Sequence, residues 1–198
     1  GALGRLDKDD IEIIVNFVNK KKITSSTVGD LPNDEKLISR NVKEISETNV
    51  DFIKIGVYEN NYIKTLSNIK SCKKLIAVFF ADKFLPTKEE ISILKKSGFR
   101  GVMIDTSNKN SGNLFNHVTC SDINNFLSIA KSMDLLTGVA GSINMSHINE
   151  IIELNPNYIG FRGALCENSS VRSSKISAIN VNNIINLVNK SKNIAVSA

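Results

Sequence analysis

The stretch Val50-Asp51-Phe52-Ile53-Lys54-Ile55-Gly56-Val57 decides how the rest of the chain is interpreted. It is a short apolar run rich in β-branched residues and ended by Gly56, which predicts a strand buried on both faces. Lys54 interrupts this run. A lysine held in an apolar strand tends to lose its proton, and it then becomes a candidate imine former or base. The alternative is a lysine that reaches past the strand end to solvent, or one neutralised by a carboxylate.

Apolar runs of this kind alternate with amphipathic helical patterns along the chain. Strands are predicted at about 23–28, 50–57, 75–80, 101–104, 135–140 and 158–161. Helices are predicted at about 11–18, 34–48, 61–70, 87–97, 121–130, 145–154 and 181–188. Such alternation predicts right-handed parallel βαβ units. Because no G-x-G-x-x-G follows the first strand, a dinucleotide-binding sheet is disfavoured. We therefore predict an α/β fold, a TIM (β/α)8 barrel that lacks its first strand–helix–strand, with residues 1–198 as one barrel domain.

Composition narrows the classes of partner. The 198 residues are 41% hydrophobic and 23% charged, enough for one globular core. A net charge of +5 favours anionic substrates such as sugar phosphates. The lysines are scattered and tryptophan is absent, so nucleic acid is not an expected partner. No apolar run approaches the roughly 18 residues of a membrane span, so no membrane partner is expected. Three distant cysteines without Cys-x-x-Cys favour the cytoplasm over a disulfide framework or a zinc site.

Polar or glycine-rich segments follow successive predicted strands. In chain order they are Asp30, Lys54, Asp82, Asp105 with Lys109, Gly141-Ser142 and Arg162-Gly163. Carboxyl ends of parallel strands carry the active site in such folds. Carboxylates and lysines that converge there shift one another's pKa values and supply both an acid and a base. The glycines, with Ser142 and Arg162, predict a phosphate-binding site.

Each of these residues also has a plainer interpretation. Asp30 is suited to capping a turn, and Asp105 to a structural ion pair with a lysine. Gly141 and Gly163 are suited to close packing, and Arg162 to a helix C-terminus. Each motif is weak when it is taken singly. Their shared position at the same end of successive strands is what favours a common site.

Several stretches together resemble one known family. They are residues 26–30 (STVGD), 52–58 (FIKIGVY), 80–82 (FAD), 103–106 (MIDT) with Lys109, 113–115 (NLF), 140–143 (AGSI) and 160–167 (GFRGALCE). In this order and spacing they resemble the archaeal-type (5-formylfuran-3-yl)methyl phosphate synthases, also called 4-(hydroxymethyl)-2-furancarboxaldehyde-phosphate (4-HFC-P) synthases. The resemblance extends from residue 1 to about residue 190.

The resemblance implies a (β/α)8 lyase that condenses two glyceraldehyde 3-phosphate molecules into a furan phosphate. Phosphate and water are lost, a lysine imine forms, and the product serves methanofuran biosynthesis. It implies Lys54, Asp105 and Lys109 as catalytic residues. Residues expected to bind substrate or its phosphates are Asp30, Asp82, Gly141, Ser142, Arg162 and Gly163. No cofactor and no metal are expected.

The opening residues bear on the imine lysine. The segment Gly1-Ala2-Leu3-Gly4 is similar to a family segment that follows this lysine. The imine lysine is therefore expected just before residue 1, and the chain as printed is expected to have little or no activity.

One departure and two alternatives accompany this interpretation. After Cys166-Glu167 the family pattern is glycine-rich and basic, whereas here residues 168–175 contain no glycine, and Arg172 and Lys175 supply the charge. One alternative is another class I aldolase-like phosphosugar lyase with a different acceptor. The other is a non-catalytic phosphate-binding barrel. An incomplete barrel exposes strand edges, which favours self-association into a homo-oligomer.

Overall fold

The computed structural model describes residues 2–108, 110–168, 171 and 174–196. The strands are β1 (Ser25–Thr27), β2 (Phe52–Val57), β3 (Lys74–Phe80), β4 (Gly101–Asp105), β5 (Leu136–Val139) and β6 (Tyr158–Ile159). The α-helices are α1 (Lys8–Val18), α2 (Glu35–Ser46), α3 (Tyr62–Asn68), α4 (Lys88–Lys96), α5 (Cys120–Ser132), α6 (Ile148–Glu153) and α7 (Ala178–Val196). Short 3₁₀ turns occupy Leu114–Asn116, Met145–His147 and Gly163–Leu165.

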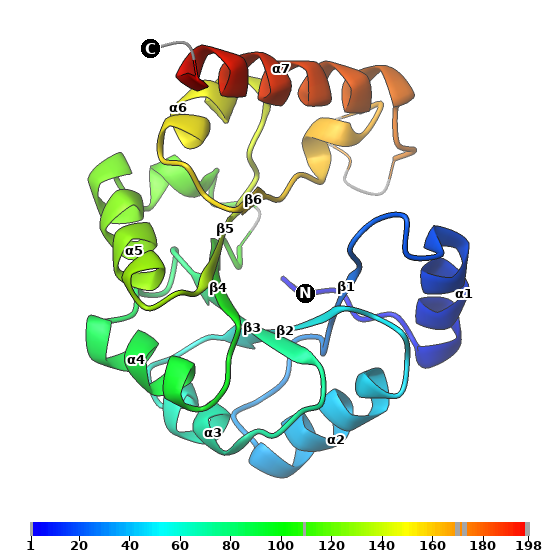
Figure 1. The fold of residues 1–198 in the computed structure, drawn as a ribbon, viewed down its shortest axis with the longest axis vertical. Coiled ribbons are helices and arrows are strands. Elements are labelled where there is room, and N and C mark those ends of the chain that lie inside the picture. Colours follow the sequence, from blue (N-terminus) through cyan, green and yellow to red (C-terminus); the bar gives the residue numbers. More distant parts are fainter. Residues whose placement is uncertain (1, 109, 169–170, 172–173, 197–198) are drawn as a thin grey trace.

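All the described strands belong to one parallel sheet in the order β1-β2-β3-β4-β5-β6. Figure 1 shows them as an arc with the helices on its outer side. This confirms the predicted α/β alternation and parallel pairing. The arc has the curvature of a barrel wall, and β1 and β6 form its two edges. Closure into eight strands stays a prediction, because the described residues supply six.

Helix starts follow from local side-chain hydrogen bonds. The Thr87 hydroxyl caps α4 by accepting a hydrogen bond from the Glu90 N–H, and the Glu90 carboxylate accepts one from the Thr87 N–H. Thr119 and Asp122 form the same reciprocal capping box before α5. These bonds satisfy amide groups that the first helical turn leaves unpaired.

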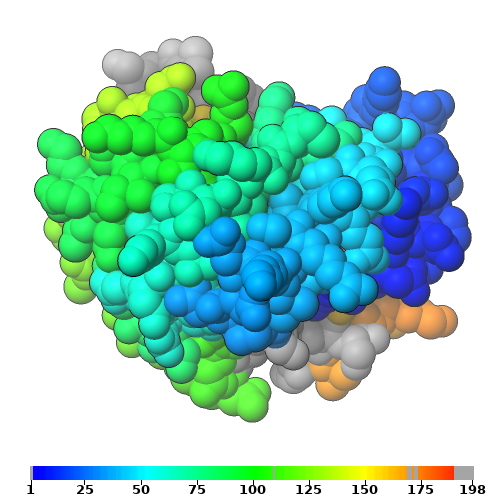
Figure 2. Space-filling model, turned by 90° about the horizontal axis from the view of Figure 1, so that it is seen from below, coloured from blue at the N-terminus to red at the C-terminus, as the bar shows by residue number. Residues whose placement is uncertain are grey.

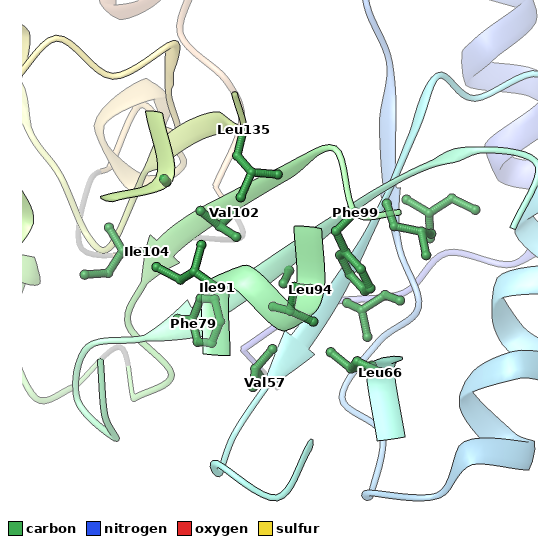
Figure 3. Packing of buried hydrophobic residues seen from close by; sticks show 14 of the residues in the cluster. Val57, Leu66, Phe79, Ile91, Leu94, Phe99, Val102, Ile104 and Leu135 are labelled. Carbon is green, nitrogen blue, oxygen red and sulfur yellow. The ribbon is translucent and has the colours of Figure 1, made fainter. Parts of the chain in front are cut away.

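The outer face of the sheet carries the larger hydrophobic core. Outward residues of β2 such as Ile53 and Ile55 are about 1% exposed or less, and they belong to one cluster with the helices. Figure 3 shows Phe79 and Val102 from neighbouring strands packed near Ile91 of α4. Figure 2 shows residues coloured from blue to green lying side by side in chain order across this side of the molecule. The helices therefore hold the strands in their curved register.

The inner face of the sheet is built differently. Alternate residues point there, and they form a separate cluster around Phe52, Val78, Phe80 and Met103. Lys54 lies on this inner face, between Phe52 and Gly56. Leu3, from the segment before α1, also belongs to this cluster. The inner face is therefore largely apolar along the strands, and polar residues lie near the carboxyl ends of the strands.

Candidate active site

A cavity of about 560 Å³ opens at the carboxyl ends of the strands. The sequence-predicted residues that line it together are Lys54, Asp105, Gly141, Ser142, Arg162 and Gly163. Asp105 ends β4, and the glycines, Ser142 and Arg162 follow the ends of β5 and β6, as the shared direction of parallel strands requires. Lys54 lies within β2 and not at its end, which corrects the prediction that it follows the strand. Other lining residues come from the loop after β4 and from the segment before α1, among them Asn110, Asn113 and Leu3.

Lys54 supplies an amine to this cavity, and it is half-buried. Burial lowers the Lys54 pKa from its ordinary value of 10.5, whereas the negative charge of Asp105 acts in the opposite direction. The net result is a lysine that gives up its proton more readily than a solvated one. Asp105 itself accepts a hydrogen bond from the Thr106 N–H at 2.7 Å, which orients the carboxylate at the end of β4.

Tyr158 lies against Lys54 on the inner face. The Lys54 Nζ atom is 5.5 Å from the centre of the Tyr158 ring, within the range of a cation–π contact. Burial raises the pKa of the Tyr158 hydroxyl. This hydroxyl is buried and has no hydrogen-bond partner among the described residues. The ring occupies space that Gly138 leaves open, because a Cβ on Gly138 would lie 2.3 Å from the ring atom Cζ.

The Gly141-Ser142 turn forms another wall. Gly141 has a φ of 117° and Ser142 a φ of 51°. A positive φ is unusual for serine and is characteristic of functional or strained turns. A side chain on Gly141 would press on Thr106 and Leu114, and the Leu114 N–H donates to the Gly141 carbonyl at 2.9 Å. The loop after β4 is thereby attached to the end of β5.

Two of the predicted carboxylates lie outside this lining. Asp82 accepts hydrogen bonds from the Ser107 N–H and Oγ–H at 2.6 and 2.5 Å, and from the Asn108 N–H at 2.9 Å. Asp30 accepts the Leu3 N–H at 2.9 Å and the Tyr58 hydroxyl. Neither residue lines the cavity with the other predicted residues, and their contact with substrate stays a prediction. Each is directed toward backbone N–H groups of a neighbouring loop, which it organises.

Two basic residues named from the sequence, Lys109 and Arg172, lie outside the described residues. Asn110, next to Lys109, is described and lines the cavity. Lys175, named together with Arg172, is described and is not among the residues that line the cavity. Sequence reasoning passed over Leu3 and Tyr158. A usable signal existed for Tyr158, because the predicted strand 158–161 places it on the same face as Gly160, which lines the cavity.

The part of the chain that the structure describes holds no group of three or more His, Cys, Asp or Glu side chains arranged to bind a metal ion. Within the same residues, no helix has both the length and the apolar character needed to cross a bilayer. The cavity offers a desolvated amine, a carboxylate, and a rim with a guanidinium, a hydroxyl and glycines. Such a set suits proton transfer on an anionic carbonyl compound.

A curved parallel sheet whose cavity opens at the carboxyl ends of the strands is the arrangement of β/α-barrel enzymes. The solved structure of 3-hexulose-6-phosphate synthase from Salmonella typhimurium matches this fold with a TM-score of 0.65 at 11% identity, over 93% of this chain and 81% of that one. That similarity concerns the fold alone.

The sequence comparisons identify the family. The family model described as 4-HFC-P synthase matches residues 1–185, and the chain belongs to this family. A putative (5-formylfuran-3-yl)methyl phosphate synthase of Methylorubrum extorquens is 31% identical over 175 residues, which are 88% of this chain and 73% of that protein. The (5-formylfuran-3-yl)methyl phosphate synthase of Archaeoglobus fulgidus is 31% identical over 173 residues, and the match covers 78% of this chain and 72% of that protein. The resemblance inferred from short stretches is thereby confirmed.

Proposed function

We propose that this chain takes part in the condensation of two glyceraldehyde 3-phosphate molecules to 4-(hydroxymethyl)-2-furancarboxaldehyde phosphate, a step toward methanofuran-type cofactors. In this proposal Lys54 is the group that transfers protons. The observation that carries it is the position of Lys54, half-buried in the cavity and under the opposing influences of burial and Asp105. Membership of the 4-HFC-P synthase family supports the choice of substrate and product.

The chemistry requires groups of this kind. Joining two triose phosphates needs a base that removes a proton from the carbon beside a carbonyl. The carbanion formed in this way then makes the new C–C bond to the second molecule. Loss of one phosphate and two water molecules then balances the conversion to an aromatic furan phosphate, and each departing oxygen needs a proton. Lys54 can take part in both kinds of transfer, because an amine with a lowered pKa gives up its proton more readily than a solvated lysine, and its protonated form can donate one.

We assign the phosphate contacts to the other side of the cavity. Arg162 supplies a guanidinium at the rim, and Ser142 and Gly163 lie beside it in the lining. A guanidinium suits a phosphate group because its N–H donors form paired hydrogen bonds to the oxygens. Lysine imine formation belongs to the proposed reaction as well, and we assign it to a lysine other than Lys54.

The test measures furan product by absorbance and mass after glyceraldehyde 3-phosphate is added. It is run on the 198-residue chain and on a fusion that places the N-terminal segment of the Archaeoglobus relative before residue 1. Lys54→Met is compared with Lys74→Met. Lys74 is a suitable control, because it also lies over an aromatic ring, with its Nζ 5.3 Å from the Phe52 centroid, but at the amino end of β3.

We expect furan product in at least one of the two proteins, lost with Lys54→Met and kept with Lys74→Met. Borohydride trapping followed by peptide mapping should place the adduct outside the peptide that contains Lys54. A trapped adduct on Lys54 would refute its assignment to proton transfer. Absence of product from both folded proteins would refute the proposed reaction, and a panel of other phosphosugars would then test the aldolase-like alternative.

A further inference from the structure

The segment before α1 enters the interior of the arc. Figure 1 places the N-terminal end of the chain inside the curve of the strands. Leu3 is only 8% exposed, belongs to the inner cluster and lines the same cavity as Lys54. A residue in an irregular segment, distant in sequence from the strands, thus forms part of the cavity wall.

Side chains from β1, from the loop after β1 and from the residue that follows β2 hold this segment in place. The Leu3 N–H donates to Asp30 Oδ1 at 2.9 Å, and the Tyr58 hydroxyl donates to the same oxygen. Thr27 Oγ1 donates to the Gly4 carbonyl at 2.6 Å. We call Asp30, Tyr58 and Thr27 the anchor. Its bonds involve successive backbone groups, so they fix the path of the segment.

The inner face is shaped to receive this segment. A Cβ on Gly56 would lie 3.1 Å from Leu3 Cδ1 and 2.8 Å from Tyr58 Cε2, so glycine leaves the space that both side chains use. The Tyr58 ring stacks on Phe80, with the ring centroids 4.7 Å apart. Gly56 stands two residues after Lys54 on the same face of β2. The anchored segment therefore covers the strand directly beyond the lysine.

We propose that Asp30 is a positioning residue, which with Tyr58 fixes residues 2–4 as the wall that keeps water from Lys54. The proposal rests on the proposed function only in taking Lys54 as the reactive amine. It gives Asp30 a part in the site without contact with substrate. Among the residues that the structure describes, the charged or aromatic groups that act on Lys54 are Asp105 on β4 and the Tyr158 ring on β6, and neither belongs to the anchor.

The experiment is competitive labelling of lysines with acetic anhydride across a pH series, read by peptide mass spectrometry. It yields a titration midpoint and a maximal rate for Lys54 without any substrate, so it can fail or succeed independently of synthase activity. The variants are Asp30→Ala, Asp30→Asn, Tyr58→Phe and Leu3→Ala. Asn retains a carbonyl oxygen that accepts the same two hydrogen bonds, while the charge is removed.

Asp51→Ala is the matched control. Asp51 also binds a backbone N–H and a hydroxyl of a neighbouring segment, through Thr24 at 2.8 and 2.9 Å, but at the amino end of β2. Its loss should lower stability and leave the Lys54 titration unchanged. This separates a local effect at the cavity from general destabilisation of the sheet.

With Asp30→Ala and Leu3→Ala, we expect the Lys54 midpoint to move to higher pH and its maximal rate to rise several-fold, because water reaches the amine. Tyr58→Phe should give a smaller change in the same direction, and Asp30→Asn should match the wild type. A wild-type Lys54 profile in folded Asp30→Ala would overturn the proposal, as would equal effects of Asn and Ala at position 30. If Asp30→Ala does not fold, Leu3→Ala decides, and an unchanged profile there also overturns it.

Discussion

Gly138→Ala should damage both the stability of the sheet and the surroundings of Lys54. An added Cβ would lie 2.3, 2.4 and 2.6 Å from the Cζ, Cε2 and Oη atoms of Tyr158. Carbon atoms in contact prefer about 3.5 Å or more, so the ring has to move by roughly 1 Å. Its hydroxyl is fully buried, so this movement displaces other atoms. Overpacking of this kind costs about 1–3 kcal/mol of unfolding free energy.

The same movement has a chemical consequence. The Tyr158 ring lies 5.5 Å from the Lys54 Nζ atom, and it forms one side of the lysine's surroundings. A displaced ring weakens the cation–π contact, which stabilises the protonated amine. We therefore expect the Lys54 labelling midpoint to change in Gly138→Ala together with the stability.

The assay is urea unfolding followed by far-UV circular dichroism, since the chain has no tryptophan. Gly160→Ala is the control on the same face, because its Cβ would come no nearer than 3.0 Å to another atom, Ala140 Cβ. It should cost less than Gly138→Ala. Tyr158→Leu should remove most of the Gly138→Ala penalty in a double-mutant cycle. Equal penalties with and without the tyrosine ring would refute the steric argument.

Burial lowers the pKa of Lys54 in the folded state, so the unfolded chain binds this proton more tightly. The unfolding free energy should therefore increase with pH between the folded-state pKa and the ordinary value of 10.5. Lys54→Met should abolish this increase. Urea midpoints measured across this range would show the rise in wild type alone. Burial raises the pKa of Asp82, but hydrogen bonds from the loop after β4 outweigh this effect and hold the pKa below its ordinary value. Asp82→Ala should lower the unfolding free energy by about 1–3 kcal/mol and speed amide hydrogen exchange at Ser107. The stabilisation by Asp82 should also disappear as the pH falls through its folded-state pKa, and a flat profile would contradict this. A hydrogen bond to a neighbouring carboxylate, with burial, raises the pKa of Cys120 to about 11, so exposed Cys72 should react first with a thiol reagent at pH 8.

The fold was predictable because its main signals are local. Apolar strands and amphipathic helices alternate, and parallel pairing follows from that alternation. The edge strands are shorter than predicted, 25–27 instead of 23–28 for β1 and 158–159 instead of 158–161 for β6. Each edge strand has hydrogen-bonding partners on one side only, so regular pairing ends sooner there.

The site was predictable where a rule of topology applies and unpredictable where loop geometry decides. Asp105 and Arg162 share a cavity because strand ends of a parallel sheet meet at one edge, and Lys54 lines the same cavity from the inner face of β2. The direction of Asp82 depends on which amides the loop after β4 presents, and residue spacing does not encode that. The approach of Leu3 to β2 depends on a contact between segments far apart in the sequence, which no local pattern reveals.

The order of the sheet bears on how the chain acquires its structure during synthesis. Each strand that the structure describes pairs only with the strands next to it along the chain, as Gly138 does with Tyr158 and Gly101 with Leu136. No pairing has to wait for a distant segment, which keeps the loops that must close short. When a new strand–helix unit emerges from the ribosome, the strand with which it pairs has already been synthesised. The sheet can therefore lengthen in the direction of translation, one unit at a time.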